Sequence, residues 1–161
     1  RQKGFDRLIR AVAALKRPDV RLVLIGEGPD REALTAQARD LGVTLIMPGF
    51  VRDPVHWLAQ ADLFVLSSRW EGFGHVIVEA MAAGAPVIAF DCPHGPRDII
   101  RDRETGLLVA DGDEAALTKA MAELLNDRML ARRLSESAAK DAARFSSAHI
   151  ADQYLKLFSS L

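Results

Sequence analysis

Hydrophobic positions along this chain follow two periods, which alternate from one end to the other. Leu8, Ile9 and Val12 recur at helical spacing, whereas residues 20–25 are a short run of mostly Val, Leu and Ile. Glycines mark several helix ends, as Gly42 does after the second helical segment. The pattern predicts helices over 4–17, 29–41, 53–60, 74–83, 96–101, 113–126, 128–144 and 147–158, and strands over 20–25, 43–47, 62–66, 86–90 and 106–109.

This alternation predicts an α/β fold, a three-layer αβα sandwich with a mainly parallel sheet. Residues 1–144 form its main domain and residues 145–161 a C-terminal helix. The first helical segment has no strand before it, so we expect the first strand of the sheet to lie upstream. Ligands of such sheets bind beyond the carboxyl ends of the strands. The loops expected at that edge are 26–28, 48–52, 67–74 and 91–97.

Composition narrows the class of protein. A chain of 161 residues fits one domain, and 49% hydrophobic with 27% charged residues is ordinary for a globular protein. The formal net charge of −1 provides no broad basic surface for nucleic acid. One cysteine, Cys92, excludes an internal disulfide and fits a reducing compartment. We therefore expect a cytoplasmic protein without a nucleic-acid partner.

The richest chemistry lies between Glu71 and Gly84. The strand over 62–66 runs into a glycine-bearing turn, and an Ala-rich helix follows at once. The first N–H groups of a helix have no partner within it, and the helix dipole favours an anion there. Glu71 precedes this helix, and Glu79 stands about two turns into it, where we expect it to point inward. A phosphate with several hydroxyls, as in a nucleotide sugar, suits this arrangement.

Two other interpretations remain open. Gly26 and Gly28 are typical of a nicotinamide-dinucleotide site, but Arg31 occupies the position of the third glycine, which disfavours an oxidoreductase. A non-catalytic nucleotide-binding or scaffold domain is the second alternative. No Asp-x-Asp pair occurs, so the sequence predicts no bound metal.

Several motifs resemble those of one enzyme family. The runs 71–74 and 79–82, followed by 84–89, resemble the signature of retaining glycosyltransferases of family 4, in their C-terminal, donor-binding Rossmann-like domain. Further matching pieces occur in the same order, namely residues 3–5, 24–29, 48–51 and 106–109.

The resemblance implies one half of a GT-B fold and a role for each matching residue. Lys3 would contact the donor diphosphate, and Glu71 would face the transferred sugar, so these two are the expected catalytic residues. Glu79 would bind the ribose hydroxyls. The family also has an arginine a few residues before this lysine, and Arg1 stands too close to be it. The other expected substrate-binding residues are Gly26, Phe50, Val51, Gly72, Phe73, Gly74, His75 and Arg97.

The implied function is transfer of a hexose-type sugar, with retention, from a nucleotide diphosphate sugar to an acceptor. A UDP-sugar is favoured over a GDP-sugar, and no cofactor is expected. The loop over 91–97 resembles a variant among enzymes that build bacterial surface polysaccharides or glycolipids. Expected partners are an N-terminal acceptor domain, without which this fragment is inactive, the inner face of the cytoplasmic membrane, and a second copy contacting the apolar edge at Leu155, Phe158 and Leu161.

Overall fold

The computed structural model describes residues 2–159, and the predicted order of helices and strands is confirmed within them. Arg1 and Leu161, both named above, lie outside the described residues. Most boundaries agree within two or three residues. The elements are α1 (Phe5–Ala14), β1 (Arg21–Ile25), α2 (Arg31–Asp40), β2 (Thr44–Gly49), α3 (Pro54–Ala59), β3 (Phe64–Leu66), α4 (His75–Ala82), β4 (Val87–Asp91), α5 (Pro96–Ile99), β5 (Leu107–Ala110), α6 (Glu114–Asn126), α7 (Arg128–Ala142), the 3-10 turn η1 (Ala143–Phe145) and α8 (Ser147–Ser159).

Local chemistry explains where several helices begin. Asp53, Asp113 and Asp127 precede α3, α6 and α7, and each carboxylate accepts a hydrogen bond from the backbone N–H three residues further on. These bonds satisfy N–H groups that have no partner within the helix. Pro48 and Gly49, expected in a loop, instead belong to β2. A proline fits there because β2 is an edge strand, which tolerates a missing donor.

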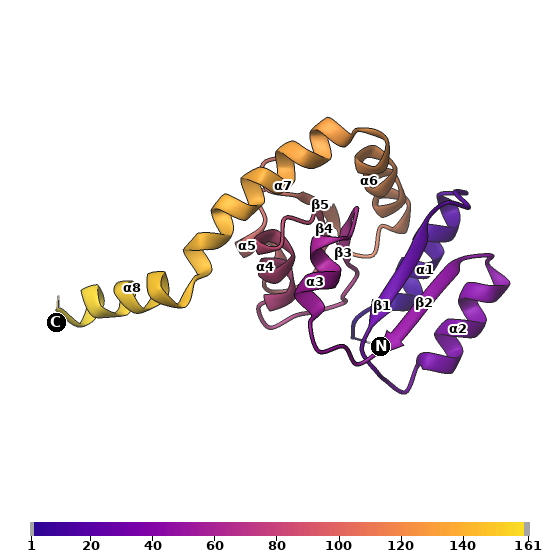
Figure 1. Ribbon diagram of the computed structural model, residues 1–161, viewed down its shortest axis with the longest axis horizontal. Helices are drawn as coiled ribbons and strands as arrows, with labels where there is room; N and C mark the ends of the chain where they lie inside the picture. Colours follow the sequence, from indigo (N-terminus) through magenta and orange to yellow (C-terminus); the bar gives the residue numbers. More distant parts are fainter. Residues whose placement is uncertain (1, 160–161) are drawn as a thin grey trace.

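The strands β3, β4 and β5 form a parallel sheet with helices on both faces. Successive side chains of β4 point to opposite faces, so Ile88 and Phe90 join one hydrophobic core while Val87 and Ala89 join the other. Helices α1, α2 and α6 contribute to the first core and α3, α4 and α5 to the second (Figure 1). The predicted α/β class with three layers is confirmed around this sheet.

The single sheet expected from the sequence is divided in two. Strands β1 and β2 pair in parallel with each other, and they share no ladder with β3 (Figure 1). Leu24 of β1 nevertheless belongs to the same hydrophobic core as Ile88 of β4. The expected parallel α/β arrangement is present, but the described strands form two sheets, with a groove of about 1190 Å³ between β1 and β3.

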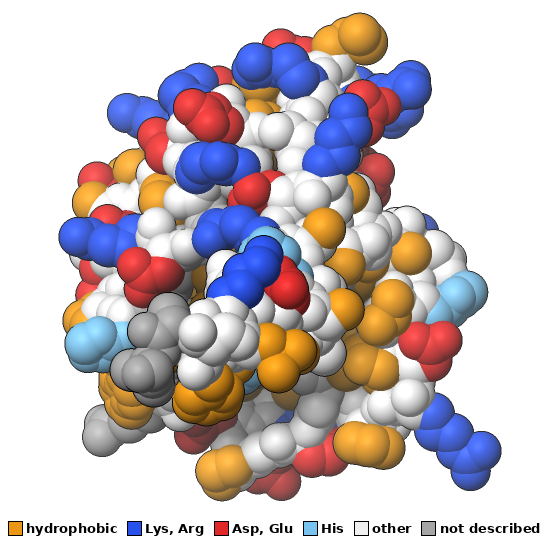
Figure 2. All heavy atoms as spheres, turned by 90° about the vertical axis from the view of Figure 1, so that its left-hand side faces the viewer, with side chains coloured by type: hydrophobic (Ala, Val, Ile, Leu, Met, Phe, Trp, Pro, Cys, Tyr) orange, Lys and Arg blue, Asp and Glu red, His pale blue; other side chains and the backbone are white. Residues whose placement is uncertain are grey.

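The last helix, α8, extends away from both sheets (Figure 1). Its apolar side chains Tyr154, Leu155, Leu157 and Phe158 are exposed. Figure 2 views this end of the molecule and shows hydrophobic side chains among charged ones there. The exposed apolar edge expected at Leu155 and Phe158 is thus present. Among the described residues, no helix is both long and apolar enough to cross a membrane.

Candidate functional site

A buried carboxylate marks the loop that follows β3. Glu71 is only 8% exposed, and its Oε1 lies 2.8 Å from the ammonium of Lys3, which is half-exposed. The hydroxyl of Ser68 donates a hydrogen bond to the same oxygen at 2.6 Å. A buried carboxylate needs such partners because desolvation of an unpaired charge is strongly unfavourable. The two predicted catalytic residues are therefore in direct contact.

The segment before α1 is fixed against the end of β3 by its backbone. The Ser67 hydroxyl donates to the carbonyl of Lys3 at 2.9 Å, and the Arg69 N–H donates to the carbonyl of Gln2 at 2.8 Å. Gly4 adopts a left-handed backbone conformation with φ of 63°, and a Cβ there would lie 2.0 Å from the Ser67 carbonyl oxygen. Only glycine allows this close approach, which positions Lys3 beside Glu71.

A bidentate ion pair reinforces the same junction. Arg69 donates to both carboxylate oxygens of Asp6 at 2.9 and 2.7 Å. The hydrogen bond from Arg69 is the main cause that lowers the pKa of Asp6 to about 2. Arg10 also contacts Asp6 and binds Glu114 at 2.8 and 2.6 Å, so α1 is tied to both the β3 loop and α6.

The start of α4 has the geometry expected of an anion site. Gly74 precedes the helix with φ of 95°, and no side chain caps the first N–H groups. The loop over 91–97 packs closely against this turn. Gly95, with φ of 91°, approaches the Phe73 carbonyl so closely that a Cβ would lie 1.9 Å from the oxygen. The N–H groups at the start of α4 are therefore available to a ligand.

The groove between β1 and β3 collects some of the predicted residues. Lys3 and Glu79 both line it, as does Ser68. Glu71 is not among the lining residues, but it contacts two of them, Lys3 and Ser68. The expectation that Glu79 points inward was wrong, because its side chain is exposed and faces the groove rather than the alanines of α4.

The remaining residues of the β3 loop surround the start of α4. Gly72 and His75 are exposed, and Gly74 is buried. The ring of Phe73 lies edge-on to His75 at 5.0 Å and to Phe145 at 5.6 Å between centroids. Phe73 therefore packs within the protein, whereas His75 stays accessible.

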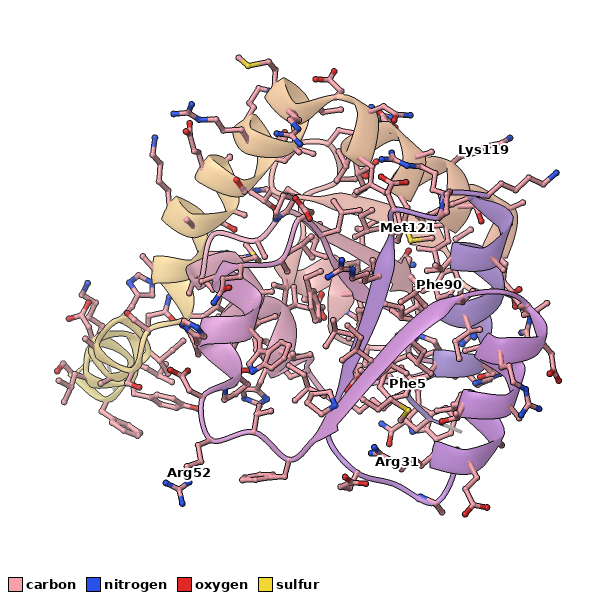
Figure 3. All side chains as sticks on the ribbon, turned by 45° about the vertical axis from the view of Figure 1, so that its right-hand side comes forward. Phe5, Arg31, Arg52, Phe90, Lys119 and Met121 are labelled. Atoms are coloured by element: carbon pink, nitrogen blue, oxygen red, sulfur yellow. The ribbon has the colours of Figure 1, made fainter. Side chains whose placement is uncertain are left out.

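The loops after β1 and β2 lie together. The Gly26 N–H donates to the carbonyl of Gly49, Phe50 is 85% exposed and Val51 is half-buried. Figure 3 shows Arg52, next along the chain, pointing away from the fold. The dinucleotide alternative gains nothing here, because Arg31 is paired with Glu27 and with the carbonyl of Met47.

Arg97 does not reach the groove. It donates two hydrogen bonds to Asp91, at 2.9 and 2.5 Å, and lines a separate hollow of about 590 Å³ with His94 and Asp111. Cys92 is buried nearby, and burial raises the pKa of its thiol. The structure therefore separates Arg97 from Lys3 and Glu79.

Sequence reasoning missed Ser68 and the pair of Asp6 with Arg69. The available signal was the polar run that begins at Ser67, directly after an apolar strand, because polar residues there face the ligand-binding edge of a parallel sheet. Within residues 2–159 no cluster of three or more His, Cys, Asp or Glu side chains is placed to hold a metal ion.

Comparison with known families now adds to this geometry. The sequence profile of the family described as "Glycosyl transferases group 1" matches residues 1–141. The chain belongs to this family. Lipopolysaccharide core biosynthesis glycosyltransferase LpsE of Rhizobium meliloti is 40% identical over 99% of the chain, and putative glycosyltransferase EpsD of Bacillus subtilis is 39% identical over 98%. The chain spans 47% and 42% of these two relatives, less than half of each.

Solved structures of glycosyltransferases also resemble this chain. Anabaena HepE in complex with UDP superposes with a TM-score of 0.91 at 29% identity, covering 99% of this chain and 46% of that one. Staphylococcus aureus TarM, in a complex that includes UDP, also gives 0.91, at 27% identity over 98% of this chain and 33% of that one. These neighbours are GT-B glycosyltransferases, so the predicted Rossmann-like fold of one GT-B half is confirmed.

Proposed function

We propose that this chain is the donor-binding part of a retaining glycosyltransferase that moves a hexose from a nucleotide diphosphate sugar to an acceptor. The observation that carries the proposal is the contact of Lys3 with Glu71 beside the groove that Glu79 also lines. Membership of the group 1 family supports it. The acceptor would be held by another part of the full-length protein, since the relatives are more than twice as long.

The chemistry follows from where charge develops. When the bond between the sugar and the diphosphate breaks, negative charge grows on the diphosphate. The Lys3 ammonium and the uncapped N–H groups at the start of α4 are fixed donors of the kind that stabilise such charge. A single well-placed donor contributes about 3–4 kcal/mol in sites of this type.

Glu71 would orient the sugar. Both Lys3 and Ser68 bind its Oε1, so its Oε2 can accept a hydrogen bond from a sugar hydroxyl. A bound diphosphate would draw Lys3 away from Glu71, because the phosphate oxygens compete for the same ammonium. The Lys3 and Glu71 pair is thus the resting form of two groups that separate when the donor binds.

The nucleoside end would lie along the groove. Glu79 is exposed there and would accept hydrogen bonds from the two ribose hydroxyls, with the loop that contains Phe50 and Val51 near the base. We favour UDP as the nucleotide, since HepE and TarM were both solved with UDP. His75, Gly72 and Gly74 would contact phosphate and sugar through the turn before α4.

The biological setting follows from the relatives. LpsE is named for lipopolysaccharide core biosynthesis, and a relative from Campylobacter jejuni acts on a diphospho-undecaprenol substrate by name. We infer that the full-length protein acts in the synthesis of a bacterial surface polysaccharide or glycolipid. It would work in the cytoplasm and associate peripherally with the inner membrane face, where lipid-linked acceptors lie.

Calorimetric titration with UDP, GDP and ADP tests the proposal. We expect UDP to bind with a sub-millimolar dissociation constant and more tightly than the other two. Glu79→Ala should weaken UDP binding more than binding of inorganic diphosphate, because only UDP carries ribose. Glu136→Ala, which removes an exposed glutamate of α7, is the matched control and should change neither.

Two results would argue against the assignment. If the folded chain binds none of the three nucleotides, the donor site is not where we place it. If the full-length protein binds UDP but transfers no sugar from any UDP-sugar, the non-catalytic alternative is correct. Equal losses of UDP and diphosphate binding in Glu79→Ala would contradict the ribose contact alone.

A further inference from the structure

The hollow at the carboxyl ends of β4 and β5 lies outside the proposed donor site. Its volume is about 590 Å³, within the range of roughly 300–1000 Å³ that ligand pockets occupy. Among residues 2–159, it shares no lining residue with the groove between β1 and β3. Most of its lining is polar, namely Asp91, His94, Arg97, Asp98 and Asp111. The protein therefore has a second cavity with the polar character of a binding site.

This hollow meets the donor site at Glu71. The Glu71 N–H donates a hydrogen bond at 3.3 Å to the carbonyl of Pro93, and Pro93 lines the hollow. The Glu71 carboxylate contacts Lys3 and Ser68, which line the groove. Glu71 thus lies between two cavities, and the groove is the one proposed for the nucleotide. Because a transferase must bring two substrates together at the transferred sugar, the hollow is placed to admit the second.

Ion pairs hold the polar groups of the hollow in position. Arg97 donates hydrogen bonds to both carboxylate oxygens of Asp91, at 2.9 and 2.5 Å. Arg7 of α1 is buried, and it donates to Oδ1 of Asp111 at 2.9 Å. A carboxylate oxygen can accept more than one hydrogen bond, so Asp91 and Asp111 can still accept from a ligand. Acceptors that are already fixed in place lose little conformational freedom when a ligand binds.

The charges of the hollow favour a neutral ligand. Asp91 and Asp111 are each paired with an arginine, and Asp98 adds a third carboxylate that is exposed. With histidine counted as neutral, the local balance is slightly negative, which disfavours a phosphate or another anion. In the part of the chain that the structure describes, no cluster of these side chains is placed to hold a metal ion. A ligand with several hydroxyls fits best, since each hydroxyl both donates and accepts.

We propose that this hollow binds a sugar residue of the acceptor. The hydroxyls of the sugar donate to Asp91 and Asp111, and the guanidinium of Arg97 donates to them. This inference rests on the proposed function, because it assumes that the donor sugar lies at Glu71. It narrows the acceptor to a saccharide, whose next residues lie on the part of the full-length protein beyond this chain.

The test measures binding of small sugars to the full-length protein saturated with UDP. The probes are the methyl α-pyranosides of glucose, galactose, mannose and N-acetylglucosamine, with inorganic phosphate as the anionic probe. Saturation-transfer NMR gives their dissociation constants, and calorimetry gives that of UDP. Arg97→Ala and Asp111→Asn change the hollow. Arg103→Ala is the matched control, because Arg103 also binds a carboxylate, that of Glu123, with two hydrogen bonds and lines neither cavity.

We expect at least one glycoside to bind without displacing UDP. Arg97→Ala should weaken its binding by roughly tenfold, the effect of one charge-assisted hydrogen bond. Asp111→Asn should weaken it less, because the amide oxygen still accepts a hydrogen bond. Arg103→Ala should change glycoside binding less than about twofold, and none of the three variants should change UDP binding, since their side chains lie outside the groove.

Four results would overturn the proposal. The first is that none of the four glycosides binds, and the second is that they compete with UDP, which would place them in the groove. The third is an equal loss of glycoside binding in Arg97→Ala and Arg103→Ala. The fourth is binding of phosphate that depends on Arg97, which would make the hollow an anion site.

The two calorimetric outcomes separate this inference from the proposed function. If UDP binds but no glycoside does, only the acceptor site is wrong. If UDP does not bind, the proposed function fails, and the assignment of the hollow to an acceptor fails with it.

Discussion

The two sheets of this protein make a direct comparison. In β4, four consecutive side chains from Val87 to Phe90 are fully buried, whereas in β1 only Leu24 is buried. Both segments are short apolar runs in the sequence, and both form parallel strands. Strand β4 has β3 and β5 on its edges, while β1 has β2 on one edge and the groove on the other. Neighbours, rather than the strand's own residues, determine how deeply it is buried.

Two kinds of contact hold the sheets together in place of a shared ladder. Helix α1 packs its buried Leu8 and Ile9 into the core that also contains Phe90. At the carboxyl edge, polar contacts join the segment before α1 to the loop after β3, including those of Lys3 with Glu71. The candidate site therefore lies where the three-stranded sheet of β3, β4 and β5 meets the two-stranded sheet of β1 and β2.

The largest expected effect comes from removing the same side chain from each sheet. Ile88→Ala removes a fully buried residue of β4 and should lower the free energy of unfolding by about 3–4 kcal/mol. Ile46→Ala, in β2, removes a residue that is 37% exposed and should cost about 1 kcal/mol or less. Urea unfolding of both variants measures the difference. Equal losses of unfolding free energy would mean that the two-stranded sheet is as tightly packed as the three-stranded one.

The next effect tests the contact between the segment before α1 and the loop after β3. Gly4→Ala would place a Cβ 2.0 Å from the Ser67 carbonyl oxygen, and we expect a loss of about 2–4 kcal/mol. Gly42→Ala is the matched control, since Gly42 has a similar φ of 70° but no atom within 4 Å of the added Cβ. The control should lose only about 1 kcal/mol from backbone strain. Similar losses in thermal or urea unfolding would contradict the close approach.

A smaller effect is expected from the ion pair of Asp6 and Arg69, which connects α1 to the loop after β3. Arg69→Ala should raise the pKa of Asp6 from about 2 toward its ordinary value of 3.8. The pair is partly exposed, so its loss should cost about 1 kcal/mol at neutral pH. Arg132→Ala, which breaks an exposed pair on α7, is the control and should cost less.

The sign of the pH dependence follows from the lowered pKa. Because Asp6 binds its proton more weakly when folded, the pair contributes stability above about pH 4, and this is lost as the pH falls toward 2. Urea unfolding at a series of pH values should therefore show wild type and Arg69→Ala converging near pH 2. A difference that persists unchanged at pH 2 would contradict this ionic origin.

The smallest effect concerns Cys92, which directly follows β4. Burial raises the pKa of its thiol, so the reactive thiolate is scarce in the folded protein. We expect a thiol reagent at pH 8 to modify it at least roughly tenfold more slowly than in urea, because reaction needs local opening. Equal modification rates in the folded protein and in urea would show that the structure around the end of β4 opens readily.

Much of the fold could be predicted because it depends on local patterns. Helical spacing and short apolar runs placed each helix and strand, and the glycine turn before α4 marked the site's main loop. Orientation was less predictable. Glu79 was expected to point inward but lies exposed on the groove, because its direction depends on what packs around α4. Arg97 was grouped with the site, yet its pairing with Asp91 holds it in another hollow.

The sequence alone determined the order of elements, the parallel α/β class and the residue types at the carboxyl edge. These follow from periodicity and from residues adjacent along the chain. Only the tertiary structure decided that Ser68 and Lys3 share one oxygen of Glu71, that Arg69 binds Asp6, and that the strands divide into two sheets. Such contacts join residues up to 68 positions apart, so no local pattern encodes them, and a sheet closes only where a neighbouring strand supplies the backbone hydrogen bonds.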